Sequence, residues 1–210
     1  MHWHRTPDLT ELLQRRNFEV IVTVRHPLDV LLSILHFCHY EPATAKWLEG
    51  QGGDESPLFG ADPTSPQFLQ YAVSPRAKSL LGISAEWQPL SRAVIKYEEL
   101  VADTEGALQR TLPILSCEAI EPLSEVVQRH TLDRLRLVSQ RHFWRGEPGL
   151  WRRLIPPDYR RQIYDCHKDL FELWDYGCPE GPALSVDDAR ENWRRICEPD
   201  GWPPASGGSL

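Results

Sequence analysis

The chain has 210 residues, of which 41% are hydrophobic and 25% are charged, as expected for a globular domain with a sizeable core. Its net charge of −7 argues against a broad nucleic-acid surface, and no apolar run approaches the ~20 residues that span a bilayer. The five cysteines are dispersed, without a C-x-x-C pair or a secretion signal. They therefore predict reduced thiols in a cytoplasmic protein that has no metal site.

The first predicted elements are a short helix and a strand. Residues 10–16 have helical spacing, with Asp8 as the expected cap and Leu12 among the leucines that face inward. Residues 18–24 are β-branched and almost continuously apolar. This pattern is typical of a strand that is buried on both faces of a parallel sheet.

A helix is predicted directly after this strand, because the fixed φ of Pro27 suits a helix start and residues 28–40 are strongly apolar. Two apolar strands among many helices indicate an α/β fold with a mainly parallel sheet. The remaining predictions are a loop (49–65), helices (66–90, broken at Pro75; 104–115, capped by Asp103; 122–131; 157–174), a second strand (92–97), an irregular tract (141–155) and a frayed tail (198–210).

The segment around Arg25 is the strongest candidate site. The strand delivers Arg25 to its carboxyl end, where ligands of open α/β sheets bind, and the following helix offers free N–H groups. The guanidinium supplies a planar set of donors that suits phosphate, and Ser33 could add a hydroxyl. The alternative from the residues alone is that Arg25 pairs with Asp29 and that Ser33 is an ordinary helix-surface residue.

Residues 25–37 match the sulfotransferase pattern R-x-P-x-D-V-x-x-S-x-x-x-F at every defined position. The chain thus resembles the sulfotransferases that use 3′-phosphoadenosine 5′-phosphosulfate (PAPS). The resemblance implies that Arg25 and Ser33 contact the 3′-phosphate of this cosubstrate, while Asp29 and Phe37 are structural.

Three later segments resemble the same family in order and spacing. Residues 97–100 resemble its Y-E-[DE]-L element, which makes Tyr97 either a nucleotide contact or a packing residue. Thr131 lies where the family often has a threonine near the adenine, although it could equally cap a helix. Residues 143–151 resemble the loop R-K-G-x-x-G-D-W that closes over the 3′-phosphate, which implies nucleotide binding by Arg145 and Gly146.

The same loop departs from the family at two positions, because Trp144 replaces an arginine and Leu150 replaces the aspartate. Trp151 is expected to be a core anchor rather than a substrate contact.

The family's first strand and its phosphate loop, similar to P-K-[ST]-G-[ST]-[TS], have no counterpart in this sequence. Lys78-Ser79 is the one Lys-Ser pair, and it lies in a helical pattern. The resemblance therefore implies a P-loop NTPase-like parallel sheet flanked by helices, with the first strand and phosphate loop missing. We expect residues 1–180 to form the sulfotransferase-like domain, and residues 181–210 to form a helix and a Pro/Gly/Ser-rich tail.

By resemblance the general base lies in the stretch before the strand, where His2 is favoured slightly over His4. The implied function is transfer of sulfonate from PAPS to a hydroxyl or amine of a small molecule or glycan. The alternative is a catalytically inactive fragment that acts at most as a nucleotide-binding or interaction module. Asp54 and Glu55 indicate either a cationic or polyol acceptor or a solvated loop. Neither the acceptor nor the oligomeric state follows from the sequence.

Overall fold

A computed structural model describes residues 4–40, 55–138 and 147–197 of the chain. These residues are mostly helical and include a two-stranded parallel sheet, so the chain is of the mixed α/β class. They group into two compact units. Unit 1 is drawn from Met1–His26 and Ser79–Pro148, and unit 2 from Pro27–Lys78 and Gly149–Leu210.

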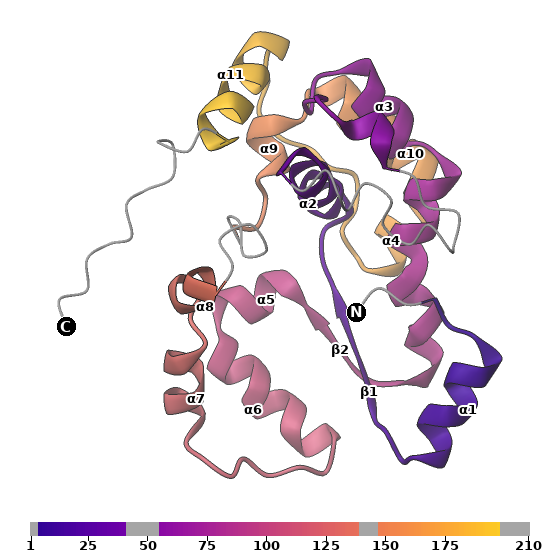
Figure 1. The fold of residues 1–210 in the computed structure, drawn as a ribbon, viewed down its shortest axis with the longest axis vertical. Coiled ribbons are helices and arrows are strands. Elements are labelled where there is room, and N and C mark those ends of the chain that lie inside the picture. Colours follow the sequence, from indigo (N-terminus) through magenta and orange to yellow (C-terminus); the bar gives the residue numbers. More distant parts are fainter. Residues whose placement is uncertain (1–3, 41–54, 139–146, 198–210) are drawn as a thin grey trace, which may run out of the picture. The chain divides into compact units, whose positions relative to one another are not determined.

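The sheet belongs to unit 1. Strand β1 (Val20–Val24) pairs in parallel with β2 (Ser91–Lys96), and the two strands lie side by side in Figure 1. Both predicted strands are confirmed. Because the pairing is parallel and Val24 lies opposite Lys96, the two strands end at the same edge of the sheet.

The prediction that the first strand is buried on both faces is wrong. Along β1 the residues alternate between buried and more exposed, with Val22 at 5% and Ile21 at 42% exposure. In the described part of the chain one face of this strand is therefore left largely open. The β-branched residues favour a strand whichever face of the sheet they point to, but only the residues on one face pack into the core.

Among the described residues, the helical segments that lie wholly in unit 1 are α1 (Pro7–Arg15), η4 (Gln88–Leu90), α5 (Tyr97–Ala102), α6 (Thr104–Ile114), α7 (Leu123–Arg129) and α8 (Leu132–Val138). The predicted cap of α6 is confirmed, because the carboxylate of Asp103 accepts the Gly106 N–H at 2.9 Å. For α1 the predicted cap is wrong. The Thr6 hydroxyl accepts the Leu9 N–H at 3.2 Å, while Asp8 lies in the first turn.

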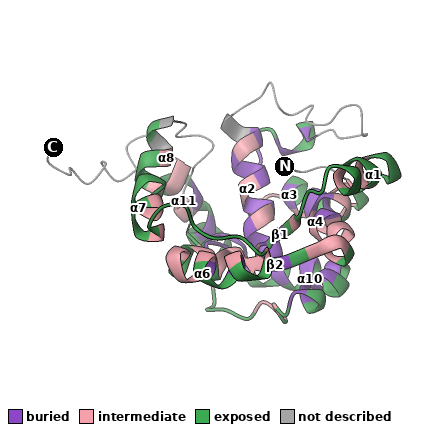
Figure 2. Ribbon diagram, turned by 90° about the horizontal axis from the view of Figure 1, so that it is seen from below, coloured by how far each residue is buried: buried purple, intermediate pink, exposed green. Residues whose placement is uncertain are grey.

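The predicted inward face of α1 is also wrong, because this helix has no buried residue and Leu12 is 51% exposed. Figure 2 shows α1 coloured mostly as exposed, in contrast to α2 (Pro27–Tyr40), which carries buried residues along its length. The helical spacing of the leucines therefore did not predict which side chains of this short helix are buried. Apolar residues do occur singly on surfaces, and spacing alone cannot exclude this.

Unit 2 is built around α2, which begins at Pro27 as predicted. Helix α10 (Pro157–Leu173) packs on α2 and on α3 (Pro66–Ala72), while α9 (Trp151–Leu154) contacts α2 and α11 (Val186–Cys197). The break predicted at Pro75 is confirmed, since α4 (Pro75–Trp87) begins there and continues across the division into unit 1. The fully buried side chains of unit 2 include Leu28, Leu31, Leu35, Phe68, Trp151, Leu154 and Phe171.

Glu55, which precedes the short helix η3 (Ser56–Leu58), is fully buried rather than solvated or turned toward an acceptor. Its Oε1 accepts hydrogen bonds from Arg76 Nε at 2.6 Å and from the Tyr71 hydroxyl at 3.3 Å. Burial, reinforced by the charge of Glu55, raises the pKa of the Cys38 thiol to about 12. This thiol therefore stays protonated and unreactive near neutral pH. Asp54 lies outside the described residues.

None of the helices in the described ranges combines the length and the apolarity needed to cross a bilayer.

His167 lies at a kink in α10, where its backbone leaves the helical region (φ −119°, ψ 24°). The side chain is fully buried, and Nε2 lies 2.6 Å from the Ala72 carbonyl oxygen, to which it donates. Nδ1 is buried and has no hydrogen-bond partner in the part of the chain that the structure describes. Burial lowers the pKa of this imidazole, because a second proton would place an unpaired N–H and a charge in the core.

We predict that His167 makes unit 2 sensitive to acid. Its folded-state pKa is depressed, so the folded chain binds fewer protons here than the unfolded chain, in which histidine titrates near pH ~6.5. Its contribution to stability is present above that pH and is lost as the pH falls below it. His167→Gln keeps an amide donor for Ala72 but cannot titrate. In urea unfolding between about pH 7.5 and about pH 5, the variant should lose less free energy of unfolding than the wild type. Parallel losses in both proteins would contradict this prediction.

Candidate functional site

The candidate site of unit 1 lies where the two parallel strands end. Arg25 follows β1, and Tyr97 is the first residue of α5 after β2. The Arg25 guanidinium lies over the Tyr97 ring, with Cζ 4.5 Å from the ring centroid, which is a cation–π contact. The structure thus brings together two residues that were predicted from separate sequence motifs.

The half-buried guanidinium of Arg25 has spare hydrogen-bonding capacity. Its Nε is buried and has no hydrogen-bond partner among the described residues. A buried donor left unpaired costs about 1–3 kcal/mol, and charged donors cost more. Such a group therefore calls for an acceptor such as water or an anion, and phosphate oxygens match the guanidinium donors well.

A second contact joins the same two motifs. The backbone N–H of His26 donates to Oε1 of Glu98 at 2.9 Å, across a sequence separation of 72 residues. Glu98 lies in the first turn of α5, where a carboxylate is favoured by the helix dipole. This bond fixes the backbone of the turn that carries Arg25, so the side chain of Arg25 starts from a defined position.

Asp29 performs a similar task inside unit 2. It is 1% exposed, and its Oδ2 accepts the N–H of Gly149 at 2.6 Å while Oδ1 accepts the N–H of Trp151 at 3.2 Å. Gly149 has a φ of +80°, a conformation that favours glycine. The carboxylate therefore ties the first turn of α2 to the turn that begins α9. This agrees with the structural role expected for Asp29.

Trp151 is a core anchor, as predicted. Its side chain is 2% exposed, and the guanidinium carbons of Arg152 and Arg160 lie 4.4 and 5.3 Å from the ring centroid. Arg160 is itself 1% exposed and donates to the carbonyls of Arg152 and Ile155 at 2.7 and 2.6 Å. Burial lowers the pKa of Arg160, and the neighbouring charge of Arg152 adds to this effect. No sequence pattern marked Arg160, because its role depends on carbonyls of other turns.

The remaining predicted residues are not brought together by the described structure. Ser33 is half-buried on α2, in a different unit from Arg25, so their joint contact with a phosphate stays a prediction. Thr131 is exposed directly before α8. His2, Arg145 and Gly146 lie outside the described residues.

His4, the second choice for the general base, is held on both sides of its ring. Nδ1 lies 2.9 Å from Oε1 of Glu86, and Nε2 lies 3.2 Å from the Ser79 hydroxyl. An outside acceptor hydroxyl would have to displace Ser79 before His4 could deprotonate it. No sequence pattern indicated this arrangement, because His4 is distant in sequence from both partners.

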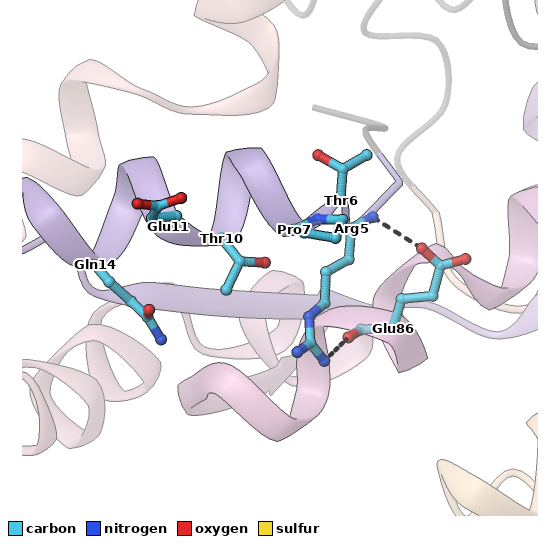
Figure 3. Close-up of a pocket in the computed structure, with 7 residues that line it drawn as sticks. All are labelled: Arg5, Thr6, Pro7, Thr10, Glu11, Gln14 and Glu86. Atoms are coloured by element: carbon cyan, nitrogen blue, oxygen red, sulfur yellow. Dashed lines mark hydrogen bonds between the residues drawn. The ribbon is translucent and has the colours of Figure 1, made fainter.

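A hollow of 610 Å³ adjoins this cluster in unit 1 (Figure 3). The backbone N–H of Arg5 donates to Oε2 of Glu86 at 2.9 Å, and its guanidinium donates to the Glu86 carbonyl at 3.5 Å. The residues lining the hollow are Arg5, Thr6, Pro7, Thr10, Glu11, Gln14 and Glu86. Within the described ranges no group of three or more His, Cys, Asp or Glu side chains is placed to bind a metal ion.

Comparisons of this chain with models of protein families, with curated proteins and with solved structures return no match.

We predict that removing the Asp29 carboxylate destabilises unit 2. Asp29→Ala leaves the N–H groups of Gly149 and Trp151 without their acceptor in a buried place, which should lower the free energy of unfolding by about 2–4 kcal/mol. The measurement is urea unfolding followed by tryptophan fluorescence.

Asp8→Ala is the matched control for Asp29→Ala, because Asp8 is an exposed first-turn aspartate on α1. It should cost less than about 1 kcal/mol, the range of a helix-dipole effect. Equal losses in the two variants would show that the Asp29 hydrogen bonds contribute no more than a first-turn charge.

Proposed function

We propose that this chain binds a 3′-phosphoadenosine nucleotide at the shared edge of β1 and β2, and that it transfers sulfonate from PAPS to a hydroxyl or amine acceptor. The observation that carries the proposal is the contact between Arg25 and Tyr97, together with the buried Nε of Arg25, which has no hydrogen-bond partner in the part of the chain that the structure describes. Both residues belong to motifs that resemble the nucleotide-binding elements of sulfotransferases.

Two properties of the Arg25 position support phosphate binding. The contact with Tyr97 uses the face of the guanidinium rather than its N–H groups, and among the described residues Nε has no acceptor, so this donor could serve an anion. Arg25 also lies at the carboxyl end of a parallel strand and two residues before the start of α2, the place where open α/β sheets bind phosphates. The fold that accompanies this proposal is a P-loop NTPase-like sheet.

The roles assigned to the other residues follow from the resemblance. Ser33, Arg145 and Gly146 would join Arg25 around the 3′-phosphate, and Tyr97 and Thr131 would contact the rest of the nucleotide. The acceptor oxygen or nitrogen attacks sulfur while the bond from sulfur to the 5′-phosphate oxygen breaks. His2 would take the acceptor proton. The acceptor class is a small molecule or a glycan.

One observation favours the alternative of a catalytically inactive nucleotide-binding or interaction module. Sulfonate transfer needs cationic donors on the departing 5′-phosphate, and the sequence has no lysine-bearing phosphate loop. Lys78-Ser79 does not substitute for it, because this pair lies inside α4 and Lys78 Nζ is 3.1 Å from Oδ2 of Asp169.

The binding half of the proposal is tested by calorimetric titration with 3′-phosphoadenosine 5′-phosphate. We predict that the wild-type chain binds this nucleotide at least ~10-fold more tightly than adenosine 5′-phosphate, which lacks the 3′-phosphate and thus loses charge-assisted hydrogen bonds. Arg25→Ala should remove this preference, and Arg25→Lys should restore only part of it, because lysine lacks the planar donor arrangement.

Arg92→Ala is the control, since Arg92 is a half-exposed arginine on β2 whose Nη1 lies 3.7 Å from Oε1 of Glu19. It should bind the nucleotide as the wild type does. Equal affinities for the two nucleotides in the wild type, or full binding by Arg25→Ala, would overturn the phosphate site.

Incubation with PAPS and a mixture of hydroxyl and amine acceptors then distinguishes an enzyme from an inactive module. Binding of the nucleotide without sulfonate transfer supports the inactive module.

A further inference from the structure

Ser79, His4 and Glu86 form a hydrogen-bonded array in unit 1 that the proposed nucleotide site does not use. Ser79 and Glu86 lie on α4 two turns apart, which is ~10.5 Å of helical rise, so their side chains share one face. His4 comes from the segment before α1, and its ring lies between them. Nδ1 is 2.9 Å from Oε1 of Glu86, and Nε2 is 3.2 Å from the Ser79 hydroxyl oxygen.

The partners of His4 determine which nitrogen carries the proton in the neutral ring. An ionised carboxylate only accepts hydrogen bonds, so Nδ1 must donate to Glu86. Nε2 then presents its lone pair to Ser79, whose O–H becomes the donor. This is the tautomer that a general base needs, with a carboxylate behind the imidazole and a hydroxyl in front of it.

The carboxylate is fixed on both of its oxygens. Oε1 faces His4, and Oε2 accepts the backbone N–H of Arg5 at 2.9 Å. Because Arg5 is the residue after His4, the same chain segment both supplies the imidazole and holds the carboxylate that orients it. Figure 3 shows Arg5 directed toward Glu86.

The array is open to a small reagent. The side chains of His4 and Glu86 are 25% and 39% exposed, and Ser79 is half-buried. The adjoining hollow is lined by Glu86 of the array and by Arg5, the residue after His4, and it offers space beside the array. A purely structural anchor for the segment before α1 would not need the serine to face the lone pair of the imidazole.

We propose that Ser79 is an activated nucleophile that takes an acyl group from esters with good leaving groups. The Ser79 oxygen attacks the ester carbonyl carbon and forms the new C–O bond, while its proton passes to Nε2 of His4. Glu86 stabilises the imidazolium. The bond between the carbonyl carbon and the leaving oxygen breaks, and the leaving oxygen takes the proton back from Nε2.

The position of Ser79 limits this chemistry to a single acylation. Ser79 lies in the interior of α4, where neighbouring backbone N–H groups are used in helical hydrogen bonds. They are therefore not directed at the carbonyl oxygen as an oxyanion hole would require. Without that stabilisation both steps are slowed. Acylation still proceeds from an ester with a good leaving group, whereas hydrolysis must expel the serine alkoxide, a poor leaving group, so the reaction stops at one acyl group per chain.

The experiment uses the full chain and p-nitrophenyl acetate. The wild type should release one equivalent of p-nitrophenolate in a burst, and peptide mapping by mass spectrometry should place the acetyl group on Ser79. Ser79→Ala should abolish the burst. His4→Gln should slow it about 100-fold or more, because the general base is lost. Glu86→Gln should slow it while leaving the site of acetylation unchanged.

Ser84→Ala is the matched control. Ser84 lies on the same helix, but its hydroxyl donates to the Thr23 carbonyl at 3.1 Å instead of to an imidazole. This variant should react as the wild type does.

Acetyl groups found only on lysine or histidine side chains of the wild type would overturn the proposal, and this result does not depend on any variant folding. A wild-type burst rate in a folded His4→Gln protein would overturn it as well. The array contains none of the residues assigned to the nucleotide, so its failure leaves that proposal unaffected.

Discussion

The parallel pairing of β1 with β2 is the constraint on which the candidate site of unit 1 depends. It brings the ends of two strands to one edge of the sheet although they are far apart in sequence. The guanidinium of Arg25 can then rest on the Tyr97 ring, and Glu98 can hold the turn at His26. An antiparallel arrangement would place the residues after the two strands at opposite edges of the sheet.

Asp29 is the corresponding constraint in unit 2. A single buried carboxylate satisfies two backbone N–H groups at the start of α9 and so joins this turn to the start of α2. The R-x-P-x-D segment therefore makes a structural contact on each side of Pro27. Before the proline, the His26 N–H donates to Glu98. After it, Asp29 accepts the N–H groups of Gly149 and Trp151. The phosphate site proposed for Arg25 would require such fixed surroundings.

The sequence predicted the elements better than their environments. Helices beginning at Pro27 and Pro157, the break at Pro75 and the Asp103 cap follow from proline geometry and side-chain capping, which act locally. Apart from the cap of α1, which Thr6 provides instead of Asp8, the errors concern burial. Leu12 and Ile21 were expected inside and are exposed, whereas Glu55 was expected near solvent and is buried beside Arg76. Burial depends on which distant segment covers a residue, and local spacing does not contain that information.

The order of residues along the chain was enough to identify the chemical groups that are present: an arginine after a strand, a tyrosine after a second strand, and a histidine-rich stretch before both. Which of these groups contact one another follows from the three-dimensional fold. In the fold the Arg25 guanidinium lies over the Tyr97 ring, and the Asp29 carboxylate accepts the Gly149 N–H. The His4 ring lies between Ser79 and Glu86. This is so because hydrogen bonds and cation–π contacts act over a few ångströms. Which side chains come within that range is decided by strand pairing and helix packing.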